Sequence, residues 1–305
     1  MNETVGELTE QLLASYARTG GINHLDGKNL PSQRTIAALA SDLLRLLFPG
    51  FFDDHVVHSS EVRDNTAPLV ESVLRRLERE LYKSLEYAPP GAMPRPELRK
   101  LARELAVEFV RCLPEVRDLL QTDVEAAYGG DPAALSQDEV IVAYPFVKAV
   151  AVQRLAHRLY RHGVALIPRI MTEWAHSRTG LDLHPGARIG SSFFVDHCTG
   201  TVVGETTVIG SRVRMYQGVG LVARSLSGGQ ALRGQKRHPT IEDRVTIYAG
   251  ATIMGGDTVV GAGSTIGANV FLTHSVPPNS LVLAEEVSVK VLPKGARAAA
   301  ADYQI

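Results

Sequence analysis

The chain places charged side chains in segments that otherwise consist of Gly, Val, Ile and Thr. One segment contains Asp182, and a second contains Asp196 and His197. A carboxylate within hydrogen-bond reach of one imidazole nitrogen fixes the tautomer and raises the basicity of the other nitrogen. We therefore expect Asp182 and His197 to form a pair in which His197 is a general base. The alternative is structural, with His197 filling a corner and Asp182 capping a turn.

A third charged segment, KRHP, contributes Arg237 and His238. An amino acid presents one ammonium and one carboxylate group, and a site with two carboxylates and a guanidinium suits both. General-base catalysis by a histidine needs no covalent enzyme intermediate. Cys198 lies beside the candidate base and offers an alternative, as a nucleophile that accepts an acyl group.

A six-residue repeat of aliphatic residues carries these segments. A fixed short period indicates a solenoid, in which each hexad is one short strand plus a tight corner and three hexads close a triangular coil. Asp182 and His197 should then lie near each other on successive coils. Skips of one or two residues are expected as corner bulges, and the long gap after Leu221 as a loop that leaves the coil. The repeat positions are Leu183, Ile189, Val195, Val203, Ile209, Met215, Leu221, Ile241, Ile247, Ile253, Val260, Ile266 and Leu272.

A β-sandwich is the alternative fold for this half of the chain. Sandwich strands repeat every 8 to 12 residues or so, with turn signals between them. Thirteen aliphatic positions close to a period of six favour the solenoid instead.

The residues before about Thr179 are rich in Leu, Ala, Arg and Glu at helical spacing, and 305 residues are enough for two domains. A solenoid needs a cover over its open end. This half is longer than a cover requires, so we expect it also to hold subunits together or to complete a site. Helices are expected in residues 3–18, 32–48, 67–87, 95–113, 114–132, 140–163 and 164–180.

Composition argues against several classes of partner. The net charge is −1, so no global field recruits nucleic acid or an anionic membrane. Cys112 and Cys198 are the only cysteines and lie in different expected domains, which fits a reducing compartment. The N-terminus lacks the basic flank of a signal peptide, and no run of 18 apolar residues occurs. A cytoplasmic protein is expected.

The segments DLHPGARIG, VDHCTGTVVGETTVIG and RHPTI together resemble the serine O-acetyltransferase family, over about residues 120 to 292. The resemblance implies an α+β multidomain chain, with an N-terminal all-helical domain (1–179), a left-handed parallel β-helix of hexapeptide repeats (180–292) and a flexible tail (293–305). It also implies the reaction. Acetyl is transferred from acetyl-CoA to the hydroxyl of L-serine, which gives O-acetylserine for cysteine biosynthesis.

The resemblance assigns roles by motif. The Asp of D-x-H-P is Asp182 and the His of D-H-x-T-G is His197, and these two form the catalytic dyad. The resemblance implies that Asp196 and the Asp of the GGDPA segment bind the ammonium group of serine. It implies that the RHP motif binds the carboxylate group of serine. The substrate-binding residues implied are thus Asp131, Asp196, Arg237 and His238.

Acetyl-CoA is implied as co-substrate, and no metal is expected. The implied contacts to acetyl-CoA are Ala249, Gly250, Gly267 and Ala268. The chain departs from the family pattern in the longer stretch 222–236, in the segment SLVLAEEVSVKVLPKG and in a long N-terminal extension.

Three alternative functions are kept. The first is a related O-acyltransferase acting on another hydroxy amino acid such as homoserine. The second is a zinc hydratase of the γ-carbonic anhydrase type, which would need histidines at matched coil positions; its candidates are His184, His197, His238 and His274. The third is a non-catalytic scaffold.

Two kinds of protein partner are expected. Packing of flat solenoid faces around a three-fold axis predicts a homotrimer or a dimer of trimers. The chain ends in Ile305, and the resemblance implies that a C-terminal Ile can enter the active site of O-acetylserine sulfhydrylase, because its carboxylate mimics that of an amino acid. Residues 302 to 305 are the expected docking segment.

Overall fold

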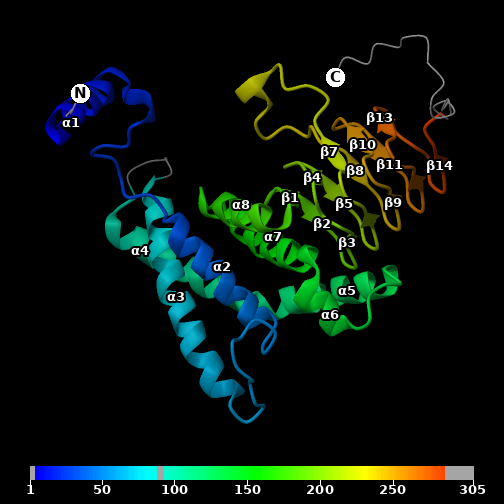
Figure 1. Cartoon of the computed structure of the whole chain (residues 1–305), viewed down its shortest axis with the longest axis horizontal. Helices are drawn as coiled ribbons and strands as arrows, with labels where there is room; N and C mark the ends of the chain where they lie inside the picture. The colour runs from blue at the N-terminus through cyan, green and yellow to red at the C-terminus, as the bar shows by residue number, and fades with distance from the viewer. Residues whose placement is uncertain (1–3, 88–92, 286–305) are drawn as a thin grey trace, which may run out of the picture. The chain divides into compact units, whose positions relative to one another are not determined.

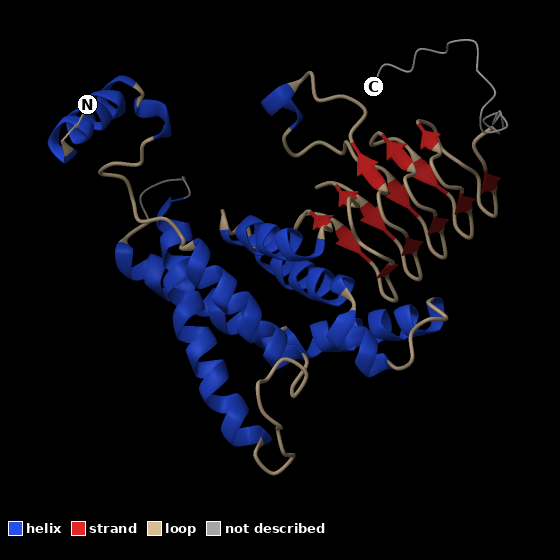
Figure 2. Cartoon of the chain, viewed as in Figure 1, coloured by secondary structure: helices blue, strands red, loops and turns tan. Residues whose placement is uncertain are grey.

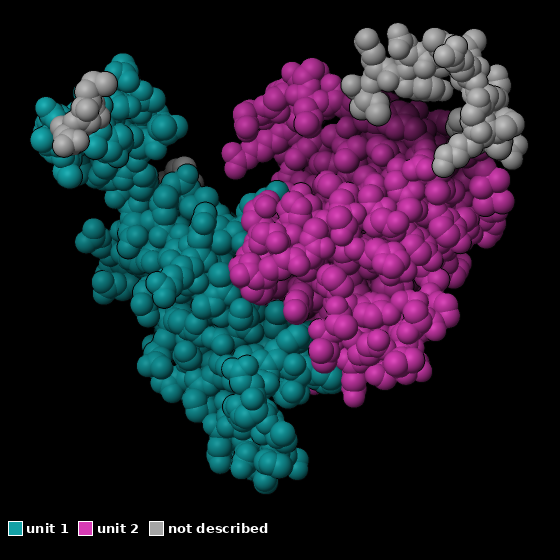
Figure 3. Space-filling model, viewed as in Figure 1, with its two compact units in different colours: residues 1–115, 158–171 teal, residues 116–157, 172–305 magenta. Residues whose placement is uncertain are grey.

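The computed structural model describes residues 4–87 and 93–285 of the chain. They form two compact units, coloured separately in Figure 3. Unit 1 takes residues 1–115 and 158–171, and unit 2 takes residues 116–157 and 172–305. The expected tail 293–305, with Ile305, lies outside the described residues. The division at residue 179 stays a prediction, although the change from helix to strand does occur there, since α8 ends at Thr179 and β1 begins at Asp182.

Unit 1 is helical, as its composition predicts. Its helices pack through amphipathic stripes, and α2 shows how the sequence specifies one. The Ser32 side chain accepts a hydrogen bond from the Thr35 backbone N–H at 3.2 Å, which caps the helix, and the apolar positions from Ile36 to Leu47 are buried. The helices lying wholly in this unit are α1 (Val5–Arg18), α2 (Gln33–Leu47), α3 (Val62–Tyr87) and α4 (Arg95–Arg111).

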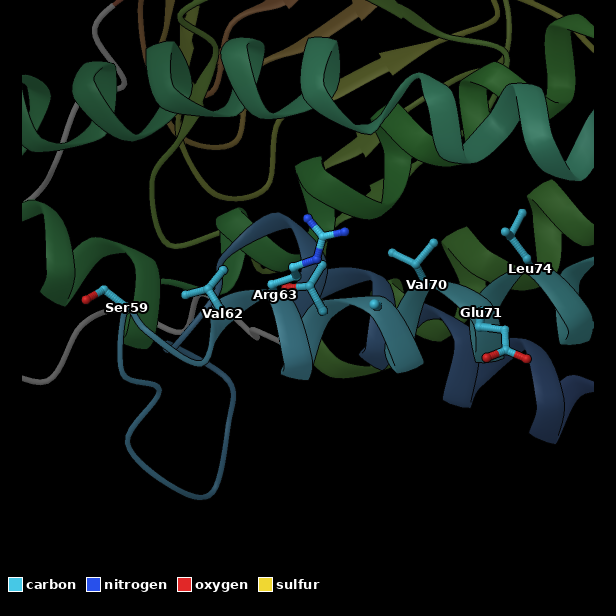
Figure 4. A pocket seen from close by; sticks show the side chains of 8 residues that line it. Ser59, Val62, Arg63, Val70, Glu71 and Leu74 are labelled. Carbon is cyan, nitrogen blue, oxygen red and sulfur yellow. The ribbon is translucent and has the colours of Figure 1, made fainter.

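A pocket of about 680 Å³ lies along the first half of α3 (Figure 4). Its walls are mostly apolar, and Arg63 and Glu71 are its charged residues. Its lining includes the hydroxyls of Ser59 and Thr66 but no histidine that could act as their base, so it does not match the chemistry that the sequence predicts. Within the described ranges, no helix is both long enough and apolar enough to span a membrane.

Four more helices follow α4 in the sequence and come directly before the solenoid: α5 (Leu113–Gly130), α6 (Gln137–Ala143), α7 (Pro145–Arg161) and α8 (Ile167–Thr179). The expected helical segment 140–163 is two helices. Pro145 disfavours helical geometry in the residue before it, and Tyr144 is extended, with φ −79° and ψ 122°. Most of α5 and α7 and all of α6 belong to unit 2.

The rest of unit 2 is a stack of short parallel strands in three sheets (Figures 1 and 2). Sheet A has the order β1-β4-β7-β10-β13, sheet B the order β11-β8-β5-β2, and sheet C the order β14-β12-β9-β6-β3. Successive strands of the chain therefore fall on successive sides of one coil, which confirms the predicted β-helix. The strands are β1 (Asp182–Leu183), β2 (Arg188–Ile189), β3 (Phe194–Val195), β4 (Val202–Val203), β5 (Val208–Ile209), β6 (Arg214–Met215), β7 (Gly220–Val222), β8 (Thr240–Ile241), β9 (Thr246–Ile247), β10 (Thr252–Met254), β11 (Val259–Val260), β12 (Thr265–Ile266), β13 (Phe271–Leu272) and β14 (Leu281–Val282).

The predicted repeat positions form the core of the solenoid. In sheet A, Leu183, Val203 and Leu221 are in register and buried, and the same holds for the repeat positions of the other sides, apart from the half-buried Ile189 of the first coil. The long gap after Leu221 leaves the coil between β7 and β8 as predicted, and it carries a 3₁₀ turn, Gly229–Leu232 (Figure 1). The period of six therefore predicted the inward side chains correctly.

Helix α7 places polar side chains against the first coil. Gln153 Nε2 donates to the Ala187 carbonyl at 2.9 Å, and His157 Nδ1 lies 2.8 Å from the Pro185 carbonyl. Arg154 donates to the Ile189 and Gly190 carbonyls at 3.1 and 2.8 Å. These contacts satisfy carbonyl groups of the terminal coil that have no preceding coil to bond.

Arg154 also forms a buried ion pair with Asp123 of α5. Two hydrogen bonds of 2.8 Å join the guanidinium to the carboxylate, and the side chains are 4% and 1% exposed. The Phe193 backbone N–H donates to the same carboxylate at 2.9 Å. The pair thus connects two helices and the first coil within unit 2.

Candidate active site at the solenoid corners

His197 lies at the corner where the chain passes from sheet C to sheet A. His197 and the following Cys198 both have left-handed backbone, with φ of 59° and 60°, which is unfavourable for two consecutive residues with a Cβ. The Cys198 and Thr199 N–H groups bond back to the Asp196 and His197 carbonyls at 2.8 and 2.6 Å. This tight turn leaves the His197 side chain 69% exposed, with Nε2 3.7 Å from the Asp196 carboxylate.

The Cys198 side chain, unlike that of His197, lies in the interior of the solenoid. It is 1% exposed, and burial raises the pKa of its thiol to about 12. A thiol must ionise to act as a nucleophile, so this environment disfavours the acyl-accepting alternative for Cys198.

Asp131 lies in the turn after α5 and is held by two donors. The Tyr144 hydroxyl donates to Oδ2 at 2.5 Å, and the Ala133 N–H donates to Oδ1 at 2.8 Å. These bonds, the Tyr144 bond above all, lower the pKa of Asp131, and the charges of His197 and Arg214 add to the effect. The same contact raises the pKa of Tyr144 to about 12, with a smaller contribution from Asp196. Asp131, Asp196 and His197 are therefore electrostatic neighbours.

Asp182 begins the first strand of sheet A and pairs with Val202 of β4, in the strand that follows the His197 corner. Its side chain is half-buried next to α8, where a carboxylate oxygen lies within 4.8 Å of ligand atoms of Glu173 and His176. The catalytic pairing of Asp182 with His197 stays a prediction.

The residues expected to contact acetyl-CoA lie on the same corner, one and two coils beyond Tyr216. Ala249 and Gly250 follow β9, and Gly267 and Ala268 follow β12. Gly250 has φ 72°, and a Cβ there would meet Asn269 Oδ1 at 2.3 Å, so this corner requires glycine. Gly267 is buried, whereas Gly250 and Ala268 are exposed.

Arg237 and His238 lie at a different corner, between sheets A and B, where Thr206 holds them. The Thr206 hydroxyl accepts from the backbone N–H of Arg237 at 2.9 Å and of His238 at 3.0 Å. The Thr206 backbone N–H donates to His238 Nδ1 at 3.1 Å, so the neutral ring carries its proton on Nε2. Burial, assisted by the Arg237 charge, lowers the pKa of His238 to about 4 and keeps the ring neutral.

Two further groups support this second corner. The Lys236 ammonium donates to the carbonyls of Thr206 at 3.0 Å and Pro239 at 3.1 Å, and also to that of His238. Arg237 Nη2 pairs with Glu205, whereas Nη1 is buried and has no hydrogen-bond partner among the described residues. A buried guanidinium nitrogen with an unused donor is costly unless something binds there.

The predicted site residues thus occupy two corners of one chain, and sheet A lies between them. The sequence did not identify Tyr144, Thr206 or Lys236, which position Asp131 and the Arg237–His238 segment. The signal available was weak, since Thr206 is an ordinary threonine that follows the segment VVGE in the repeat. Its contact with His238 forms across the long loop, whose path no local pattern specifies.

The described residues contain one group of His, Cys, Asp or Glu side chains close enough to share a metal ion: Glu173, His176 and Asp182. It includes a single imidazole. The zinc hydratase alternative needs three histidine ligands, and its candidates do not gather in this group.

Comparisons with known proteins find both similar sequences and similar structures. No protein-family model matches the chain. A Synechococcus elongatus protein named "Serine acetyltransferase, plasmid" is 45% identical over 269 residues, covering 85% of this chain and 83% of that protein. A serine acetyltransferase of Mycobacterium tuberculosis is 45% identical over 164 residues, covering 54% of this chain and 69% of that protein.

Solved structures of similar proteins have the same fold as this chain. Serine acetyltransferase isoform 3 of Entamoeba histolytica, in complex with cysteine, superposes with a TM-score of 0.72 at 31% identity, covering 94% of both chains. The Neisseria gonorrhoeae serine acetyltransferase in complex with serine has a TM-score of 0.54 at 26% identity, covering 86% of this chain and 98% of that one.

Proposed function

Because the chain belongs to the serine acetyltransferase family, we propose that it transfers the acetyl group of acetyl-CoA to the hydroxyl of L-serine. The observation that carries the proposal is the 45% identity over 85% of the chain. It is supported by an exposed imidazole at a strained corner beside two carboxylates, Asp131 and Asp196. Serine and cysteine are the molecules named as bound in the similar structures.

His197 acts as the general base of this reaction. Its imidazole accepts the proton of the serine hydroxyl while the hydroxyl oxygen attacks the thioester carbonyl carbon. The carbon–sulfur bond then breaks, and the imidazolium returns the proton to the departing CoA sulfur. Asp182 is proposed to orient the imidazole and to stabilise its charged form.

The remaining residues bind the amino-acid part of serine. Asp131 and Asp196 hold the ammonium group, and the lowered pKa of Asp131 keeps it ionised. The unused Arg237 Nη1 donor and the Nε2 proton of His238 bind the carboxylate. This assignment gives the buried Arg237 nitrogen the partner that it lacks among the described residues of one chain.

His197 precedes the sheet A strand β4 and Arg237 follows the sheet A strand β7, so the two residues lie beyond opposite ends of the sheet A strands. The proposed site therefore needs groups from two copies of the chain. The outward face of this sheet also carries exposed apolar side chains, with Val202 37% and Phe271 68% exposed. Three-fold packing buries this face and brings the His197 corner of one copy to the Arg237 corner of the next. The assembly is a trimer or a pair of trimers.

We expect sedimentation equilibrium at micromolar concentration to give three or six times the chain mass. Phe271→Asp, which puts a charge on the outward face of sheet A, should shift the protein toward smaller species. A control on another surface, Leu135→Asp, should not, because Leu135 is 85% exposed and lies in the turn before α6. A monodisperse monomer for the unmodified chain would contradict the assembly.

Release of CoA by the purified protein tests the reaction itself. The expected result is release that depends on serine, with lower kcat/KM for homoserine and threonine, because a longer or branched side chain moves the hydroxyl away from His197. Faster release with homoserine would favour the alternative acceptor. If none of the three supports release, the proposed activity is wrong.

A cytoplasmic location and docking of Ile305 to O-acetylserine sulfhydrylase stay predictions.

A further inference from the structure

A histidine and two carboxylates gather where α8 meets the first strand of the solenoid (Figure 1). Glu173 and His176 lie one turn apart on α8, and Asp182 begins β1. One ligand atom from each of the three residues lies within 4.8 Å of the other two, and His176 Nδ1 is 3.5 Å from the Glu173 carboxylate. Helix residues three apart share one face, and Glu-x-x-His spacing supplies two metal ligands from a single helical turn.

The end of α8 fixes the position of the third side chain. Gly180 has φ 71°, and its N–H donates to the His176 carbonyl at 2.9 Å, so the helix ends there and the chain turns into β1. The Asp182 N–H donates to the Thr201 carbonyl at 3.0 Å, which ties β1 to the next coil. The backbone that carries the three side chains is therefore held in place before an ion binds, and less ordering is needed on binding.

The three donors suit a divalent ion of the zinc class. Tetrahedral zinc, with bonds of about 2.0 to 2.1 Å, places its ligand atoms roughly 3.3 Å apart, close to the 3.5 Å between His176 and Glu173. An imidazole nitrogen among carboxylate oxygens favours zinc over magnesium and calcium, which prefer oxygen ligands alone. The side chains of His176 and Glu173 are 40% and 48% exposed, so an ion can reach them from solvent.

We propose that Glu173, His176 and Asp182 bind a divalent ion of the zinc class, and that the bound ion inhibits acetyl transfer. The ion is an inhibitor and not a cofactor. The inhibitory part rests on the proposed function, in which Asp182 orients the His197 imidazole and stabilises its charged form. An ion bonded to the Asp182 carboxylate neutralises the charge that this role requires and adds positive charge to the proposed dyad. Binding of the ion therefore lowers kcat.

Titration calorimetry of the full-length chain with zinc chloride tests the site without turnover. We expect one ion to bind at micromolar concentration and to stay bound in an excess of Mg²⁺. His176→Gln and Glu173→Gln should each weaken this binding at least about tenfold, since loss of a residue that merely hydrogen-bonds a ligand typically has that effect. Unchanged binding in both variants, or no zinc binding by the unmodified chain, would overturn the site.

Two controls locate the ion. His162→Gln removes an imidazole that is 41% exposed and 3.5 Å from Glu108, but to which the described residues bring no third ligand, so zinc binding should not change. His197→Asn should also keep its zinc binding. A loss in His197→Asn would place the ion at the proposed base and overturn the site. Melting temperatures without zinc identify a folding defect, and the exposed Glu173 keeps the test decisive if His176→Gln is destabilised.

Initial rates of thioester loss with serine and acetyl-CoA test the inhibition. Added zinc should lower kcat, and EDTA should restore it. Relative to their own zinc-free rates, His176→Gln and Glu173→Gln should need at least about tenfold more zinc for the same fractional loss. Zinc that binds at this group without lowering kcat would overturn the inhibitory role. If the chain shows no serine-dependent rate, the proposed function fails, whereas the calorimetry still decides the metal site.

Discussion

Replacing His197 by asparagine is expected to lower kcat for serine acetylation by about 10² to 10⁴, the usual contribution of a general base. Asparagine is the appropriate substitution because His197 has φ 59°, and asparagine tolerates left-handed backbone better than alanine does. The corner then keeps its shape while the proton acceptor is lost. Steady-state rates of CoA release, measured over a range of serine and acetyl-CoA concentrations, give kcat and both KM values.

The control for this variant is His162→Asn. His162 is 41% exposed and lies 3.5 Å from Glu108, within the helical unit 1. Its replacement should leave the rate unchanged. His197→Asn should also keep its affinity for acetyl-CoA and its melting temperature, because the imidazole is mostly solvent-exposed. A rate within a few-fold of the unmodified enzyme would exclude His197 as the base.

Replacing Arg154 by methionine is expected to have the largest effect on stability, a loss of about 3 to 5 kcal/mol in the free energy of unfolding. Asp123 would be left as a buried carboxylate with only the Phe193 N–H to bond it. The Ile189 and Gly190 carbonyls would also lose their donor. Denaturant unfolding followed by circular dichroism measures the loss.

The pH dependence of this variant provides a specific check. Burial raises the pKa of Asp123 even in the intact pair, and loss of Arg154 raises it further. When the pKa of a carboxyl group is higher in the folded state than in the unfolded state, the folded state loses stability as the pH rises past these two pKa values. The deficit of Arg154→Met should therefore grow as the pH rises from about 4 to about 7.

A double variant, Asp123→Leu with Arg154→Met, removes both charges and serves as the comparison. It should recover part of the stability lost in Arg154→Met, since no unpaired charge stays buried. The recovery should be incomplete, because three backbone groups still lose their partners. Equal stability of the single variant and the unmodified chain would show that the pair does not hold the first coil to α5 and α7.

The sequence by itself determined the β-helix and the position of its core. Side-chain direction in a short strand is a local property, so aliphatic residues at a period of six had to face inward, and residues such as Val203 and Ile247 do so. The motif around His197 also predicted the general base, a role that stays a prediction, and the structure leaves that side chain exposed at a corner. The Ser cap before α2 and its apolar stripe were equally local.

Only the tertiary structure decided which distant residues support that site. Thr206 holds His238, Arg154 pairs with Asp123, and Tyr216 stacks on Tyr248, each across 30 or more residues. These contacts depend on the number of residues that each corner absorbs and on where the chain returns after the long loop. A periodic pattern does not specify those quantities, because extra residues at a corner shift the register of every later coil without changing the local preference of any strand.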